Sequence, residues 1–116
     1  MTKDKFNDVR ITPEAAEWKS EVELATNVLC EVVGRSSQLV NVDWEVSKDY
    51  RDRTMLRLKL KDSFGSSAQT DFAPDEFKND AHLRRRLYSL WGDVLQQKAE
   101  RQMEKLQLAF QQRSEE

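Results

Sequence analysis

The spacing of apolar residues changes twice along the chain, and this change constrains the fold more than any other feature. Large apolar residues recur every three or four positions from 18 to 33, alternate with polar residues in 40–46 and 56–61, and recur every three or four positions again from 83 to 110. Spacings of three and four create one apolar face on a helix, and alternation creates one on a strand. The sequence therefore predicts a helix, then strands, then a second helix.

Residues 13–33 are predicted to form the first helix. Thr12 can accept a hydrogen bond from an unpaired backbone N–H, Pro13 suits the first helical position, and Glu14 complements the positive end of the helix dipole. Gly34 is suited to end the helix in a left-handed conformation.

Residues 40–46, 56–61 and 68–72 are predicted to form three strands, of which the third has the weakest pattern. Short polar connections join them, and short connections favour neighbouring antiparallel strands. We therefore expect an α+β fold of order α-β-β-β-α, with a three-stranded antiparallel meander. Both helices should pack on its apolar face, and the C-terminal helix should extend beyond it.

A trial register follows if apolar residues must meet on one face of the sheet. It places Trp44 opposite Leu56, and Leu56 opposite Phe72. The expected core comprises Trp18, Val22, Leu29, Val42, Trp44, Leu58, Leu60, Phe72, Phe77, Leu87 and Trp91.

The polar face of the same sheet carries a row of charges. The trial register places Arg57 between Asp43 and Asp71, with Lys59 beside them. This row is interpreted first as a cross-strand charge ladder that stabilises the sheet. The alternative is a ligand-binding site formed by Asp43, Arg57, Lys59 and Asp71.

The last helical region is predicted to begin with a short turn at 74–78, followed by a long helix from about residue 80. Its core-facing residues end at Val94, and their azimuth is then occupied by Lys98, Arg101 and Lys105, at about 100° per residue. A second apolar stripe lies roughly opposite and comprises Leu95, Ala99, Met103, Leu106 and Phe110.

One straight helix cannot pack both of these apolar faces against one small core. The second stripe is therefore predicted to contact a partner, although a bend near Gly92 or Gln96 would let it pack on its own sheet. We divide the chain into a loose N-terminal arm at 1–12, a single α+β domain at 13–95 and a projecting helical tail at 96–116.

The composition narrows the possible functions. The 116 residues carry a formal net charge of −2 with both signs interspersed, which gives no overall attraction to nucleic acid or to an anionic membrane. Cys30 is the single cysteine, and no run of about 18 apolar residues is present. We expect a cytoplasmic protein that does not enter a membrane.

Residues that would specify a chemistry are sparse. The single histidine, His82, has no metal-type spacing around it, and the three glycines are not clustered, so no catalytic residue, metal site or cofactor is predicted. Arg84, Arg85 and Arg86 diverge around a helix and form no flat basic patch, so nucleic-acid binding is the least favoured function.

The sequence favours a small non-enzymatic protein–protein interaction module of adaptor or chaperone type. We expect it to form a homodimer, or to bind another protein, through the C-terminal helix. A ligand-binding or enzymatic domain that uses the open polar face of the sheet is the alternative.

Overall fold

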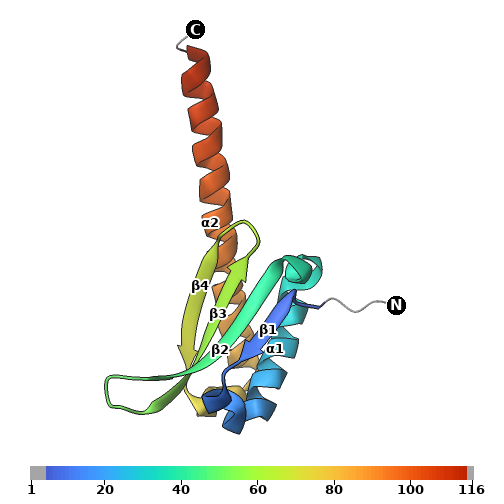
Figure 1. Cartoon of the computed structure of the whole chain (residues 1–116), viewed down its shortest axis with the longest axis vertical. Coiled ribbons are helices and arrows are strands. Elements are labelled where there is room, and N and C mark those ends of the chain that lie inside the picture. Colours follow the sequence, from blue (N-terminus) through green and yellow to red (C-terminus); the bar gives the residue numbers. More distant parts are fainter. Residues whose placement is uncertain (1–4, 115–116) are drawn as a thin grey trace.

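A computed structural model describes the backbone of residues 5–114 and the side chains of residues 5–111. These residues form four strands, two α-helices and three short 3₁₀ helices (Figure 1). In order they are β1 (Asp8–Ile11), η1 (Pro13–Trp18), α1 (Lys19–Val33), η2 (Gly34–Leu39), β2 (Val40–Lys48), β3 (Thr54–Asp62), β4 (Ser67–Phe72), η3 (Pro74–Lys78) and α2 (Asp80–Ser114).

The strands form one mixed sheet in the order β1-β2-β3-β4. Strands β2, β3 and β4 are antiparallel, as predicted, but β1 adds a fourth strand parallel to β2. The predicted three-stranded meander was therefore incomplete, because residues 8–11 of the expected arm belong to the sheet. In β1, Val9 and Ile11 alternate with Asp8 and Arg10, and Ile11 packs against the core. Residues 1–4 of that arm lie outside the described residues.

The register between β2 and β3 differs by two residues from the predicted one. Trp44 lies opposite Leu58 rather than Leu56, whereas the predicted pairing of Leu56 with Phe72 is confirmed. A slip of two residues keeps every side chain on the same face, so alternation alone cannot detect it.

The turn between β2 and β3 fixes this register. The Asp49 carboxylate accepts hydrogen bonds of 2.9 Å from the backbone N–H groups of Arg51 and Arg53, and Asp52 adopts a positive φ of 61°. The Asp49 N–H also donates to the Arg53 carbonyl at 3.0 Å. These bonds close the turn between Asp49 and Arg53 and thereby set which residues pair in the strands that follow.

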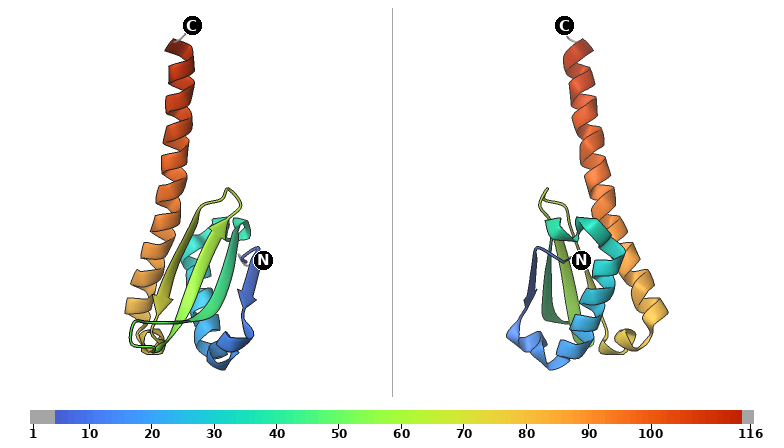
Figure 2. Two further views of the ribbon diagram at one scale, coloured as in Figure 1. Left: turned by 60° about the vertical axis from the view of Figure 1, so that its left-hand side comes forward. Right: turned by 90° about the vertical axis from the view of Figure 1, so that its right-hand side faces the viewer.

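Both α-helices cover the same face of the sheet (Figure 2). The predicted first helix divides into η1 and α1, and Gly34 ends α1 with a φ of +68°. The core lies between the sheet and the helices, with Trp44 and Phe72 fully buried and Trp18 and Trp91 only partly buried. The Trp44 indole N–H donates a hydrogen bond of 2.9 Å to Thr26 Oγ1 in α1, which satisfies the one polar group of this buried ring.

Helix α2 is much longer than the sheet that it covers. Leu83, Leu87, Leu90 and Val94 are at most 3% exposed and pack in the core. The helix then continues without a break through Gly92 and Gln96 and leaves the sheet, as Figure 1 shows. Its 35 residues span about 52 Å at about 1.5 Å per residue.

Candidate interaction surface

Polar side chains anchor α2 where it leaves the sheet. The Gln97 amide donates to the Ser67 carbonyl at 2.6 Å and accepts from the Ser67 N–H at 3.0 Å. Arg101 donates to the carbonyl oxygens of Phe64 and Gly65 in the turn between β3 and β4. Lys98 Nζ lies 4.8 Å from the centre of the Phe64 ring, a cation–π contact. Lys98 and Arg101, which follow the core-facing stripe, therefore contact this turn and fix the direction of the tail.

The five predicted partner-binding residues lie on the outward side of this anchored helix. Leu95, Met103, Leu106 and Phe110 are 47%, 58%, 55% and 67% exposed, and Ala99 is also exposed. The alternative arrangement, in which α2 bends and packs this stripe on its own sheet, is not observed, because the helix continues past the sheet without a break.

The exposed stripe also extends towards the sheet. Tyr88, which is 60% exposed, and Gly92 share its azimuth. We call the whole set the seam: Tyr88, Gly92, Leu95, Ala99, Met103, Leu106 and Phe110. Its spacings of 4, 3, 4, 4, 3 and 4 repeat every 11 residues. Because 11 residues make almost three whole turns, the seam runs nearly straight along α2 and suits a second nearly straight helix.

Contacts within the domain do not explain why position 92 of the seam is a glycine. A Cβ placed there would meet no heavy atom within 4 Å, so no neighbour within the described structure requires a glycine. Glycine inside a helix costs about 1 kcal/mol relative to alanine. An exposed glycine in this position would let another backbone approach closely.

Apolar residues outside α2 continue the surface at the foot of the tail. Leu39 in η2 is 47% exposed and Phe64 is 60% exposed. Together with Trp91 and Leu95 they line a shallow hollow at the point where α2 leaves the sheet. The exposed apolar surface is therefore continuous from this hollow to Phe110.

The two sides of the seam carry opposite charges. At about 100° per residue, Lys98 and Lys105 lie about 100–120° from the centre of the seam on one side, next to the core-facing azimuth, and we call them the basic flank. Asp93, Glu100 and Glu104 lie about 100–140° from the centre of the seam on the other side, and we call them the acidic flank. Among described residues, no ion pair joins these five side chains to one another within the chain.

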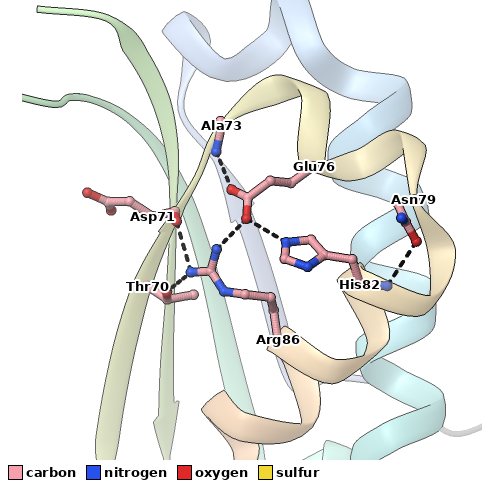
Figure 3. A network of polar contacts seen from close by, with 7 residues as sticks. All are labelled: Thr70, Asp71, Ala73, Glu76, Asn79, His82 and Arg86. Carbon is pink, nitrogen blue, oxygen red and sulfur yellow. Dashed lines mark hydrogen bonds and ion pairs between the residues drawn. The ribbon is translucent and has the colours of Figure 1, made fainter. Parts of the chain in front are cut away.

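A network around Glu76 holds the other end of α2 (Figure 3). Glu76 in η3 accepts hydrogen bonds from the Ala73 N–H at 2.6 Å and from Arg86 Nη1 at 2.6 Å, and its Oε1 lies 2.8 Å from His82 Nε2. Arg86 also donates to the Asp71 carbonyl at 3.0 Å, so the network joins η3, α2 and β4. Burial alone would raise the pKa of Glu76, but the hydrogen bonds and the Arg86 charge outweigh it and lower that pKa.

A hollow of about 330 Å³ lies beside this network, between α2 and β4. Its charged lining comprises Arg85, Arg86 and Asp93 together with His82. Arg86 is paired with Glu76, and the other two charged lining residues, Arg85 and Asp93, have opposite signs, so the lining has no excess of one charge. Nowhere in the part of the chain that the structure describes do three or more His, Cys, Asp or Glu side chains cluster as metal ligands would.

The predicted charge row on the open face of the sheet is only partly observed. Arg57 Nε lies 2.9 Å from Asp71 Oδ1, as predicted, and this hydrogen bond is the main reason why the pKa of Arg57 is raised. The second carboxylate is Glu45 rather than Asp43, because of the two-residue shift in register. Glu45 lies 3.5 Å from Arg57 and 3.0 Å from Lys59, and Asp43 lies opposite Lys59. These groups satisfy one another across three strands.

The arginine triplet diverges as the helical geometry requires. Arg84 binds Asp80 at 3.1 Å and Glu31 of α1 at 3.2 Å. Arg86 is held by Glu76, whereas Arg85 is exposed. The three side chains therefore offer no shared cationic patch to a phosphate backbone.

The comparisons with known proteins add no relationship to this geometry: no protein-family model, curated protein or solved structure matches the chain. Within the described residues, no helix has both the length and the apolar character needed to cross a membrane.

Proposed function

We propose that this protein is a non-enzymatic interaction module that binds a helical protein partner through the seam of α2. The observation that carries the proposal is the exposure of Leu95, Met103, Leu106 and Phe110, each 47–67% exposed, along one face of a helix that has left its own sheet. A contiguous apolar surface of this kind marks an interaction site in soluble proteins.

The available energy indicates the strength of binding. Complete burial of a large apolar side chain contributes about 1.5–3 kcal/mol, and these residues with Tyr88 have about half of that still to gain. The seam therefore supplies about 5 kcal/mol, and a matching partner helix supplies about as much again. Association itself costs at least about 4 kcal/mol. The balance is at most about 6 kcal/mol, which corresponds to a reversible complex with a Kd of tens of micromolar.

The anchoring of the tail supports the same function. Gln97 binds Ser67 at the start of β4 and Arg101 binds the turn between β3 and β4, so the tail is held away from the sheet rather than folded over it. A helix presented in this way keeps its apolar face available at little further ordering cost, because a pre-ordered surface loses less conformational entropy on binding.

Site-specific photo-crosslinking in cells of the source organism tests the proposal. A photoreactive amino acid replaces Leu106 in one variant and Leu108 in the other. Both leucines are similarly exposed, 55% and 59%, but they lie about 200° apart around α2. We expect a discrete protein adduct from position 106 and none from position 108. Equal labelling from the two positions, or none from either, would overturn the proposal.

The open face of the sheet is the alternative site, for a small ligand. The pairing of Arg57 with Asp71 and Glu45 favours a structural ladder there. If a small ligand binds at this face, Arg57→Ala should abolish its binding, while the crosslinked adduct at position 106 should still form.

A further inference from the structure

We infer that the partner of the seam is a second copy of this chain, with the two α2 helices parallel and related by a two-fold axis that runs along them. This inference rests on the proposed function and identifies the partner. It follows from the charges beside the seam, from the position of the folded domain and from the small residues within the seam.

The two flanks make the helix complementary to itself. When two parallel helices meet face to face around a two-fold axis along their length, the left side of each one lies beside the right side of the other. The basic flank, Lys98 and Lys105, then lies on the same side of the pair as the acidic flank of the second copy, Asp93, Glu100 and Glu104. In an antiparallel pair like flanks meet, so lysines face lysines and carboxylates face carboxylates. The charges therefore select the parallel arrangement.

The folded domain leaves room for this pairing. The core-facing residues Leu83, Leu87, Leu90 and Val94 lie about 150° around α2 from the centre of the seam. In a parallel pair the two sheets consequently lie on the outer sides of the helices. The shallow hollow formed by Leu39, Phe64, Trp91 and Leu95 lies near the base of the paired region and can contribute further apolar surface.

The small residues mark the closest approach. In a parallel pair in register, each seam residue lies opposite its own counterpart, so Gly92 meets Gly92 and Ala99 meets Ala99. Small residues at facing positions let the helix backbones come close, which accounts for an exposed glycine that the domain does not require. From Tyr88 to Phe110 the paired segment is about 33 Å long, enough for several interlocking layers of side chains.

Charge substitutions test the orientation by sedimentation equilibrium. Lys98→Glu with Lys105→Glu makes both flanks acidic, and we expect the dimer to dissociate at least about tenfold more readily at low salt. Adding Glu100→Lys and Glu104→Lys exchanges the flanks and should restore the dimer. Lys5→Glu with Lys61→Glu changes the net charge equally, away from the seam, and should leave the dimer unaffected. If the variant with all four substitutions does not form the dimer again, the parallel pairing is wrong.

Single cysteines test the register in a second experiment, in a Cys30→Ala background. A disulfide requires Cα atoms about 4.4–6.8 Å apart. A parallel pair in register predicts that Ala99→Cys and Leu106→Cys each form a disulfide-linked dimer under mild oxidation, whereas Leu108→Cys does not. An antiparallel pair brings at most one of these positions near its own counterpart, so cross-linking at only one of positions 99 and 106 would overturn the inference.

The outcomes separate this inference from the proposed function. If the purified chain stays monomeric and the adduct from position 106 contains a different protein, the second copy is wrong and the interaction module stands. If the chain stays monomeric and position 106 gives no specific adduct, both are wrong. An adduct with the mass of two chains, together with restoration by the exchanged flanks, supports both.

Discussion

The network around Glu76 predicts a specific loss of stability when its carboxylate loses its charge. Glu76 accepts one hydrogen bond from a backbone N–H and one from the Arg86 guanidinium, beside a contact with His82. Hydrogen bonds to charged groups contribute about 1.5–3 kcal/mol each. The Glu76 and Arg86 side chains are 21% and 31% exposed, so solvent weakens the ion pair and the lower end of this range applies. Glu76→Gln should therefore lower the free energy of unfolding by about 2 kcal/mol at pH 7.

The pH dependence of that loss follows from the pKa of Glu76. Because the folded state lowers this pKa, the carboxylate stabilises the fold above the pKa of an unfolded glutamate, about 4.3, and this contribution disappears as the pH falls through the folded pKa. The difference between Glu76→Gln and its parent should therefore be full at pH 7 and smaller at pH 3. Urea unfolding measures it as a midpoint shift of about 1 M at pH 7, for a slope of about 2 kcal/mol per M.

Two controls make this measurement specific. Leu106→Glu is introduced into both proteins so that self-association does not add to stability. Glu17→Gln, at an exposed position of η1, removes an equal charge and should shift the midpoint little. A Glu76→Gln deficit of the same size at pH 3 and pH 7 would show that the carboxylate charge is not the cause.

Three further predictions concern α2, again in the Leu106→Glu background. Leu90→Ala should lower the free energy of unfolding by about 2–5 kcal/mol, and Leu95→Ala by less than about 1 kcal/mol. The reason is that Leu90 is 3% exposed and Leu95 is 47% exposed. Equal losses of free energy in urea unfolding would contradict this packing. Gly92→Ala should raise the free energy of unfolding by up to about 1 kcal/mol, since the added Cβ meets no atom within 4 Å. In the intact chain, without Leu106→Glu, the same substitution should weaken the dimer. Arg101→Ala removes two hydrogen bonds to the turn between β3 and β4 and should speed amide exchange at Gly65 and Ser66; unchanged exchange would show that Arg101 does not hold this turn.

The sequence predicted the layers of the fold and the position of the exposed stripe because both depend on local periodicity. Helical spacing identified Leu83 to Val94 as core and Leu95 to Phe110 as outward-facing, and both sets lie where that spacing places them. The register of β2 with β3 depends instead on how Asp49 closes one turn. A two-residue slip leaves the alternating pattern unchanged, so Arg57 was paired with Asp43 instead of Glu45.

Contacts between distant segments were the least predictable. The strand β1 has only four residues, and it pairs with β2 across an intervening helix. The partner of His82 is Glu76, which lies in a separate short helix, so helical spacing around His82 could not identify it. The seam could have been extended to Tyr88 and Gly92 by continuing the 11-residue repeat towards the N-terminus.

Sedimentation equilibrium of three proteins tests the central claim most directly: the intact chain, Leu106→Glu and Leu108→Glu. We expect the intact chain and Leu108→Glu to rise from 13.6 kDa towards twice that mass as the concentration passes through about tens of micromolar, and Leu106→Glu to stay at 13.6 kDa. An intact chain that remains at 13.6 kDa at every concentration, or a loss of the dimer in Leu108→Glu equal to that in Leu106→Glu, would contradict self-association through the seam.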